Sequence, residues 1–137
     1  MHDSSGESRH LSVRIARTPR DVYAYASDPA NLPAWAHGVG RSVRRTGGRW
    51  IADESPLGRV GIDFAPPNDL GVLDHDVTLP SGEVVYNPVR VIADGAASEV
   101  VFTLRRRPGM DDADFRRDGE AVAADLARLR EVLESVS

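Results

Sequence analysis

Two polar residues lie on predicted strand faces that are otherwise apolar, and both are candidates for chemistry. His75 lies two positions after Leu73 and two before Val77, so strand alternation places these three side chains on one face. An imidazole titrates near neutral pH, so a histidine that faces a cavity can act as a general acid or base. A core histidine bonded to a neighbouring group is the alternative.

Asn87 is the second polar candidate, and alternation places it on the same strand face as Val85 and Val89. A buried side-chain amide needs hydrogen-bond partners, and a ligand carbonyl or hydroxyl could supply them. The alternative is that Asn87 satisfies backbone groups freed near Pro88. If the two strands are neighbours, His75 and Asn87 form a pair.

Larger side chains and one glycine complete the predicted lining of a ligand cavity. Trp35 offers a large apolar area and a polar N–H group. Gly119 lies on the apolar stripe of a predicted helix, where a glycine costs about 1 kcal/mol relative to alanine. Gly119 is included among the predicted ligand-binding residues because it would leave room for a ligand, but close backbone packing or simple sequence drift is the favoured interpretation. The remaining predicted ligand-binding residues are Phe64, Phe102 and Val122.

Several other kinds of chemistry are excluded or unsupported by the sequence. The 137 residues include no cysteine and no lysine, which excludes disulfides, thiol catalysis and Schiff-base chemistry. The four histidines are too dispersed for a zinc motif, and Gly38-Val39-Gly40 lacks the downstream pattern of a dinucleotide loop. Asp74 and Asp76 lie opposite His75 by alternation, so no catalytic carboxylate pair is expected. We therefore predict no metal and no cofactor.

Charge and hydropathy bear on the expected partners and location. The net charge of -4 differs from the basic surplus of most nucleic-acid binders, so no nucleic-acid partner is expected. No apolar run approaches the roughly 20 residues of a membrane-spanning helix, so no stable membrane insertion is expected. The first eight residues are polar and lack the apolar centre of a signal peptide. We predict a flexible tail at 1–8, one domain over 9–137 and a cytoplasmic location.

Strand-like segments separated by short turns make up most of the chain. Thr18, Pro19 and Asp21 have the pattern of a helix start, and Asp28 before Pro29 ends that helix and begins another short turn. Short turns favour antiparallel pairing, because parallel neighbours need longer crossovers. The predicted strands cover residues 9–16, 41–46, 49–53, 58–64, 71–79, 83–92 and 98–106. Pro88 falls inside one of them, where we expect an edge position or a bulge.

The C-terminal helix, predicted at 112–135, is the best-defined element. Asp111 is a suitable N-cap, with Asp114 three residues later as the second acid of a capping box. A helix of this length is about 36 Å long and must bury its apolar stripe against the sheet, because isolated helices are marginal in water. The stripe consists of Phe115, Gly119, Val122, Leu126, Leu129 and Leu133.

This order of elements resembles the SRPBCC superfamily, also called START-like or polyketide cyclase/dehydrase-like. Three pieces carry the resemblance: residues 19–36, the strand Gly71-Val72-Leu73-Asp74-His75, and the block 99–104 followed by Pro108-Gly109-Met110. The resemblance implies an α+β helix-grip fold of the birch-pollen-allergen type. In that fold a curved antiparallel sheet wraps around a long C-terminal helix, with two short helices after the first strand. The superfamily has no universal catalytic motif, so no catalytic residue carries over.

The resemblance also implies a ligand cavity, because superfamily members bind hydrophobic or amphipathic small molecules and some cyclise or dehydrate polyketide chains. Three functions remain open at this point. The first is binding of a small hydrophobic or amphipathic ligand between sheet and helix. The second is ring closure or dehydration with His75 as the acid–base residue, and the third is a nonenzymatic protein-partner module with an exposed apolar patch. The sequence does not decide whether the chain forms a homodimer.

Overall fold

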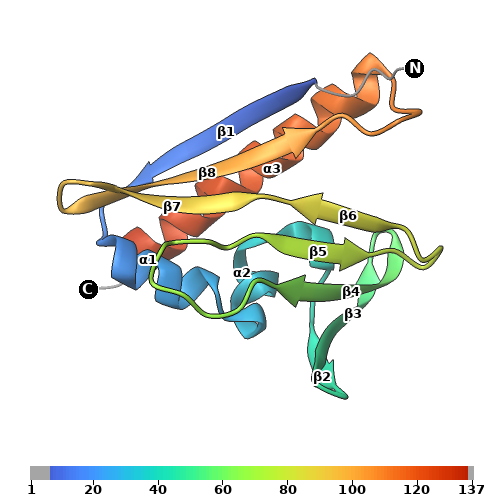
Figure 1. Ribbon diagram of the computed structural model, residues 1–137, viewed down its shortest axis with the longest axis horizontal. Helices are drawn as coiled ribbons and strands as arrows, with labels where there is room; N and C mark the ends of the chain where they lie inside the picture. Colours follow the sequence, from blue (N-terminus) through green and yellow to red (C-terminus); the bar gives the residue numbers. More distant parts are fainter. Residues whose placement is uncertain (1–6, 136–137) are drawn as a thin grey trace.

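The computed structural model describes residues 7–135, which form an α+β fold of antiparallel sheets and a long C-terminal helix (Figure 1). The predicted tail at 1–8 falls mostly outside the described residues, although Ser8 already belongs to the first strand. The strands are β1 (Ser8–Ile15), β2 (Arg44–Thr46), β3 (Arg49–Ser55), β4 (Gly58–Phe64), β5 (His75–Thr78), β6 (Val84–Asn87), β7 (Val89–Asp94) and β8 (Ala97–Arg105). The helices are α1 (Pro19–Ala26), η1 (Pro29–Asn31), α2 (Leu32–Trp35), η2 (His37–Val39) and α3 (Asp112–Glu134).

The strands are divided between two antiparallel sheets. One sheet has the order β1-β8-β7 and the other has the order β2-β3-β4-β5-β6. Pro88 separates β6 from β7, so the predicted strand 83–92 passes from one sheet to the other at the proline, which has no N–H to donate. The residues before β5 join the sheets, since Leu73 N donates to Val89 O and Val91 N donates to Gly71 O, both at 2.8 Å.

The three α-helices lie on the same side of the sheets, with α3 crossing behind β1 and β8 (Figure 1). The predicted caps are formed: the Asp111 carboxylate accepts from Asp114 N at 2.7 Å, and the Thr18 hydroxyl accepts from Asp21 N at 3.2 Å. The apolar stripe of α3 faces the core, where Leu126 and Leu129 are almost wholly buried. The predicted architecture, a long terminal helix held by antiparallel strands after two short helices, is confirmed.

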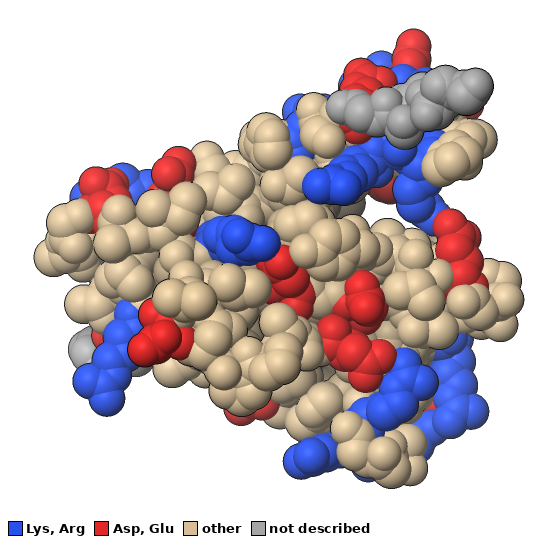
Figure 2. All heavy atoms as spheres, in the orientation of Figure 1, with Lys and Arg blue, Asp and Glu red and all other residues tan. Residues whose placement is uncertain are grey.

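The two sheets separate beyond Pro88, and this separation opens the fold. At Pro88, between β6 and β7, the chain is still bonded to β8, since Thr103 N donates to Pro88 O at 3.0 Å. Beyond it β8 continues beside β1, up to the pairing of Ser8 with Arg105, whereas β6 pairs with β5. Figure 2 shows the molecule hollowed between β6 and the region where β8 ends and α3 begins.

Candidate functional site

An apolar cavity of about 180 Å³ lies between the five-stranded sheet, the short helices and α3. Its wall is formed mostly by aliphatic and aromatic side chains, among them Leu73, Val89 and Leu126, which are each no more than 3% exposed. Apolar side chains on β4, β5 and β7 meet those of α3 here because each strand turns alternate residues inward. Six residues predicted from the sequence lie in this wall: Trp35, Phe64, His75, Asn87, Phe102 and Val122.

Gly119, included among the predicted ligand-binding residues, lies in the wall of neither hollow described for this structure. It is buried on α3, but a Cβ atom built on it would lie 2.3 Å from the guanidinium of Arg9. The Arg9 side chain, reaching over from β1, therefore occupies the space above this glycine. The surroundings of Gly119 are therefore closely packed, as the favoured interpretation had it, although by an arginine side chain and not by backbone.

The inner cavity continues into a wider cleft of about 820 Å³. The two spaces share seven wall residues, among them Leu57, Val77, Asn87 and Val122, so they adjoin each other. The cleft lies where β6 and β8 separate, and Figure 2 shows its opening on the molecular surface. Leu57, 64% exposed in the turn between β3 and β4, forms part of its rim.

His75 is held in one orientation by two contacts. Its Nδ1 lies 3.1 Å from the carbonyl oxygen of Leu73, and its ring stacks on Phe64 with the centroids 5.0 Å apart. A carbonyl oxygen only accepts hydrogen bonds, so Nδ1 carries a proton. Burial lowers the pKa of the imidazole from its usual value, although the Leu73 carbonyl and two nearby aspartates oppose that shift. His75 is thus neutral at pH 7, and its Nε2 carries a lone pair.

Asn87 is brought next to His75 by the register of the sheet. The two residues face each other across β5 and β6, and Asn87 Nδ2 lies 3.5 Å from His75 Nε2. This distance is at the outer limit of a hydrogen bond, so the two groups are close but weakly bonded. The predicted juxtaposition of His75 with Asn87 is therefore observed, at the wall of the cavity.

Trp35 forms another part of the wall and has an unusual polar atom. Its indole Nε1 is buried and makes no hydrogen bond to any described residue. Buried side-chain donors are bonded in most proteins, so such a group is a rare exception. The backbone carbonyl of Trp35 accepts a hydrogen bond from Arg128 Nε at 3.2 Å, which holds α2 against α3.

Asp125 and Arg128 were not identified from the sequence, yet both contribute to this site. Asp125 lies in the wall of both hollows, forms an ion pair with Arg128, and accepts from His37 N at 3.3 Å. Burial raises the pKa of its carboxyl group above the usual value. Together the two residues bind the segment that carries Trp35. Their spacing of three residues on a helix is the one signal that could have paired them.

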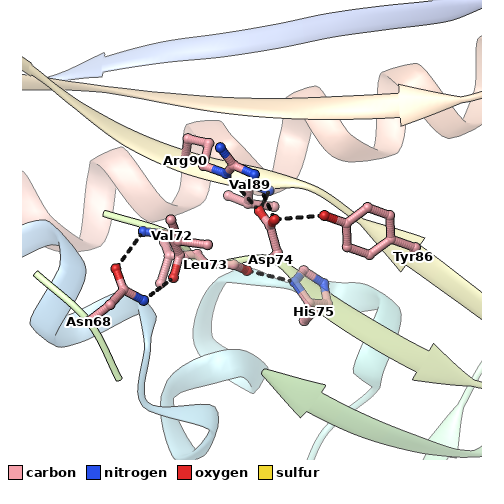
Figure 3. Close-up of polar contacts among 8 residues, drawn as sticks. All are labelled: Asn68, Val72, Leu73, Asp74, His75, Tyr86, Val89 and Arg90. Atoms are coloured by element: carbon pink, nitrogen blue, oxygen red, sulfur yellow. Dashed lines mark hydrogen bonds and ion pairs between the residues drawn. The ribbon is translucent and has the colours of Figure 1, made fainter. Parts of the chain in front are cut away.

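A second polar cluster adjoins His75 on the other side of the strand (Figure 3). The Asp74 carboxylate accepts from Arg90 Nε and Nη2 at 2.9 and 2.8 Å, from the Tyr86 hydroxyl at 2.7 Å, and from Val89 N at 2.9 Å. These bonds, led by those from Arg90, hold the pKa of Asp74 far below its usual value. The cluster connects the start of β5 to both β6 and β7, so it fixes the strand that carries His75.

The described residues offer little support for a metal or for a spanning helix. No group of three or more potential metal-ligating side chains occurs among residues 7–135. Over the same range, the helices are too short or too polar to cross a bilayer. Three consecutive arginines occupy positions 105–107, and two of them are partnered by acids: Arg106 pairs with Glu7 and Asp112, and Arg107 pairs with Glu83.

Comparison with known proteins agrees with this architecture. The sequence model of the family described as polyketide cyclase/dehydrase and lipid transport matches residues 8–134. Curated proteins give no significant match. The crystal structure of DynU16, a protein of the dynemicin biosynthetic locus, aligns with a TM-score of 0.71 at 14% identity, covering 94% of this chain. This chain spans about half, 48%, of the DynU16 chain.

Two further solved structures are similar over nearly their whole length. A protein from Bacillus thuringiensis aligns with a TM-score of 0.72 at 14% identity, covering 93% of this chain and 98% of its own. The structure of Ara h 8.0201 aligns with a TM-score of 0.65 at 12% identity, covering 94% and 98% of the two chains. At such identities the similarity shows the fold alone. From the extent of the family match, this chain belongs to the polyketide cyclase/dehydrase and lipid transport family.

Proposed function

We propose that this protein binds a small hydrophobic or amphipathic molecule in the hollow between the five-stranded sheet and α3. The observation that carries the proposal is an apolar interior space that opens to the surface through a wider cleft. A domain of this size normally packs its interior without voids much larger than a water molecule. A space that is apolar, connected to solvent and accented by a few polar groups is the usual form of a ligand site.

The sizes of the two spaces limit the ligand. The inner cavity of about 180 Å³ is close to an engineered apolar cavity of about 150 Å³ that binds benzene. One ring or a short alkyl chain therefore fills the inner part. The outer cleft is large enough for a further, more polar part of the same molecule, because arginine and acidic side chains line it beside apolar ones.

A tryptophan substitution at the junction of the two spaces tests this proposal. Val122 lines both hollows, whereas the next residue on α3, Ala123, is exposed. We expect Val122→Trp to weaken binding of the neutral fluorescent probe N-phenyl-1-naphthylamine at least tenfold, and Ala123→Trp to leave it unchanged. Circular dichroism of both variants controls for folding. Equal binding by both variants would place the probe outside the hollow and contradict the proposal.

A rim substitution provides an independent measurement if Val122→Trp fails to fold. Leu57 is 64% exposed, so Leu57→Asp removes apolar surface at the entrance with little effect on the core. We expect slower association of the same probe and weaker binding. An unchanged association rate would argue against entry through this cleft.

A second candidate function is catalysis on a polyketide-like substrate, with His75 as the residue that accepts a proton. The observation that favours it is the neutral imidazole with an unprotonated Nε2 in the cavity wall. DynU16, which shares the fold, is encoded in a biosynthetic locus. For an enzyme, His75→Phe should abolish turnover while N-phenyl-1-naphthylamine still binds. Turnover that survives this substitution would exclude His75 as the acid–base residue.

A further inference from the structure

The wall of the inner cavity is apolar except for a few polar groups. These groups limit the chemistry of the ligand more than the volume of the cavity does. Among the described residues in its wall, none is an arginine, and Asp125 is the one residue that carries a formal charge at neutral pH. An anionic group placed in this space would lose its hydration without gaining a cationic partner. A cationic group would find only Asp125, which is already paired with Arg128, so the inner part of the ligand is uncharged.

The orientation of His75 determines which polar group can be accepted. Nδ1–H donates a hydrogen bond to Leu73 O, so Nε2 of the neutral ring has a lone pair and no proton. That nitrogen can only accept a hydrogen bond. A ligand carbonyl or ether oxygen facing it would bring two lone pairs together, whereas a ligand O–H would bond to it.

The amide of Asn87 adds the complementary group. Because Nε2 is an acceptor, the amide must turn its Nδ2 toward the imidazole, as observed at 3.5 Å. That contact is longer than a good hydrogen bond, so both atoms retain bonding capacity. A hydroxyl oxygen about 2.8 Å from each atom would complete a triangle, donating to Nε2 and accepting from Nδ2.

We propose that the inner cavity takes a neutral, ring-sized group carrying a hydroxyl, such as a phenol or an enol. The hydroxyl proton is donated to His75 Nε2 and the oxygen accepts from Asn87 Nδ2. This assignment rests on the proposed binding function and specifies which molecules that function selects. Phe64 stacks on the imidazole ring of His75 and keeps it in this orientation, so Nε2 is already positioned in the free protein.

Three matched probes separate a hydroxyl requirement from simple apolar binding. 4-Propylphenol carries a hydroxyl donor, 4-propylanisole has an oxygen that only accepts, and 4-propyltoluene replaces the hydroxyl by a methyl group of similar size. Their dissociation constants are measured by calorimetry for the wild-type protein and for His75→Phe. Phenylalanine keeps a ring beside Phe64 but removes Nε2.

We expect the preference for 4-propylphenol over 4-propyltoluene to fall at least tenfold in His75→Phe, because a buried hydroxyl proton is then left without an acceptor. Binding of 4-propyltoluene should change less than threefold. If the ratio stays the same, or if 4-propylanisole binds the wild type as tightly as 4-propylphenol, the hydroxyl assignment is wrong while the cavity function stands. If none of the three binds, both proposals fail.

Nitrogen-15 spectra of the imidazole give a reading that does not depend on the variant. In the free protein the His75 ring should carry its proton on Nδ1. Addition of 4-propylphenol should shift the Nε2 resonance, and addition of 4-propyltoluene should leave it nearly unchanged. A proton on Nε2 in the free protein, or equal shifts with both probes, would overturn the assignment.

Discussion

Removing the charge of Asp74 should destabilise the protein by about 2 kcal/mol. The carboxylate accepts four hydrogen bonds, two from Arg90 and one each from Tyr86 and Val89, and its side chain is only 12% exposed. Breaking a buried ion pair typically costs about 3–5 kcal/mol. Arg90 is 51% exposed, so solvent screens part of this interaction and the smaller figure of about 2 kcal/mol applies to Asp74→Asn.

Urea unfolding and thermal melting measure this effect directly. For a chain of this length, about 2 kcal/mol corresponds to a decrease in Tm of roughly 8 °C. Asp76→Asn is the matched control on the same strand, where Asp76 faces Asp63 in the register and gains little from its own charge. That control should stay within about 0.5 kcal/mol of wild type or be slightly more stable. Equal losses in both variants would show that the Asp74 cluster has no special role.

The pH dependence of the same pair provides a second test. The pKa of Asp74 is lower in the folded protein than the ordinary value of 3.8. Its stabilising contribution is therefore complete above about pH 4 and is lost as the pH falls toward the depressed value. The difference between wild type and Asp74→Asn should thus be constant at pH 5–8 and shrink below pH 4. A difference that persists unchanged at pH 2.5 would refute the electrostatic explanation.

Three further predictions follow from other parts of the structure. Burial raises the pKa of Asp125, so its contribution to stability is largest at low pH and declines as the pH rises through the raised value. Asp125→Asn should remove this decline in urea unfolding measured from pH 3.5 to 7, and an unchanged slope of stability against pH would contradict the prediction. Gly71→Ala should destabilise the protein by about 3 kcal/mol, because φ is +76° and the new Cβ would lie 2.3 Å from the backbone oxygen of Val91. In Gly119→Ala the nearest atoms to the new Cβ belong to the flexible Arg9 side chain, so the loss should be less than about 1 kcal/mol, and similar losses of both variants in thermal melting would contradict this distinction. Leu126→Ala should cost about 3 kcal/mol in urea unfolding and enlarge the cavity, and a loss below 1 kcal/mol would mean that the site had collapsed.

The elements with strong local signals could be predicted from the sequence. The apolar stripe and the Asp111 cap determine α3 through contacts within four residues, and the structure places that helix at Asp112–Glu134. Gly47-Gly48 marks the hairpin between β2 and β3. Pro88 correctly indicates an interruption, but its consequence is a passage between two sheets. That outcome depends on which strands lie nearby, and a proline alone does not specify them.

The polar part of the candidate site was accessible to sequence reasoning through strand alternation. His75 and Asn87 were placed on inward faces by period-two patterns, and the register then made them partners. The neighbour of Gly119 could not be predicted, because the apolar stripe cannot show that Arg9, 110 positions earlier, covers this glycine. Asp125 was overlooked for a similar reason. Its bond to His37 joins segments 88 residues apart, and no local pattern encodes such a contact.

The most direct test of the central claim is an isotope-filtered NOE experiment with 4-propylphenol on methyl-labelled protein. Binding in the hollow predicts cross-peaks from the ring protons to the methyl groups of Val122 and Leu126, which line the inner cavity from α3. Leu70 and Ile92 are 77% and 47% exposed and do not belong to its described wall. Cross-peaks confined to those exposed residues, or none at all under saturating probe, would contradict a ligand-binding cavity between sheet and helix.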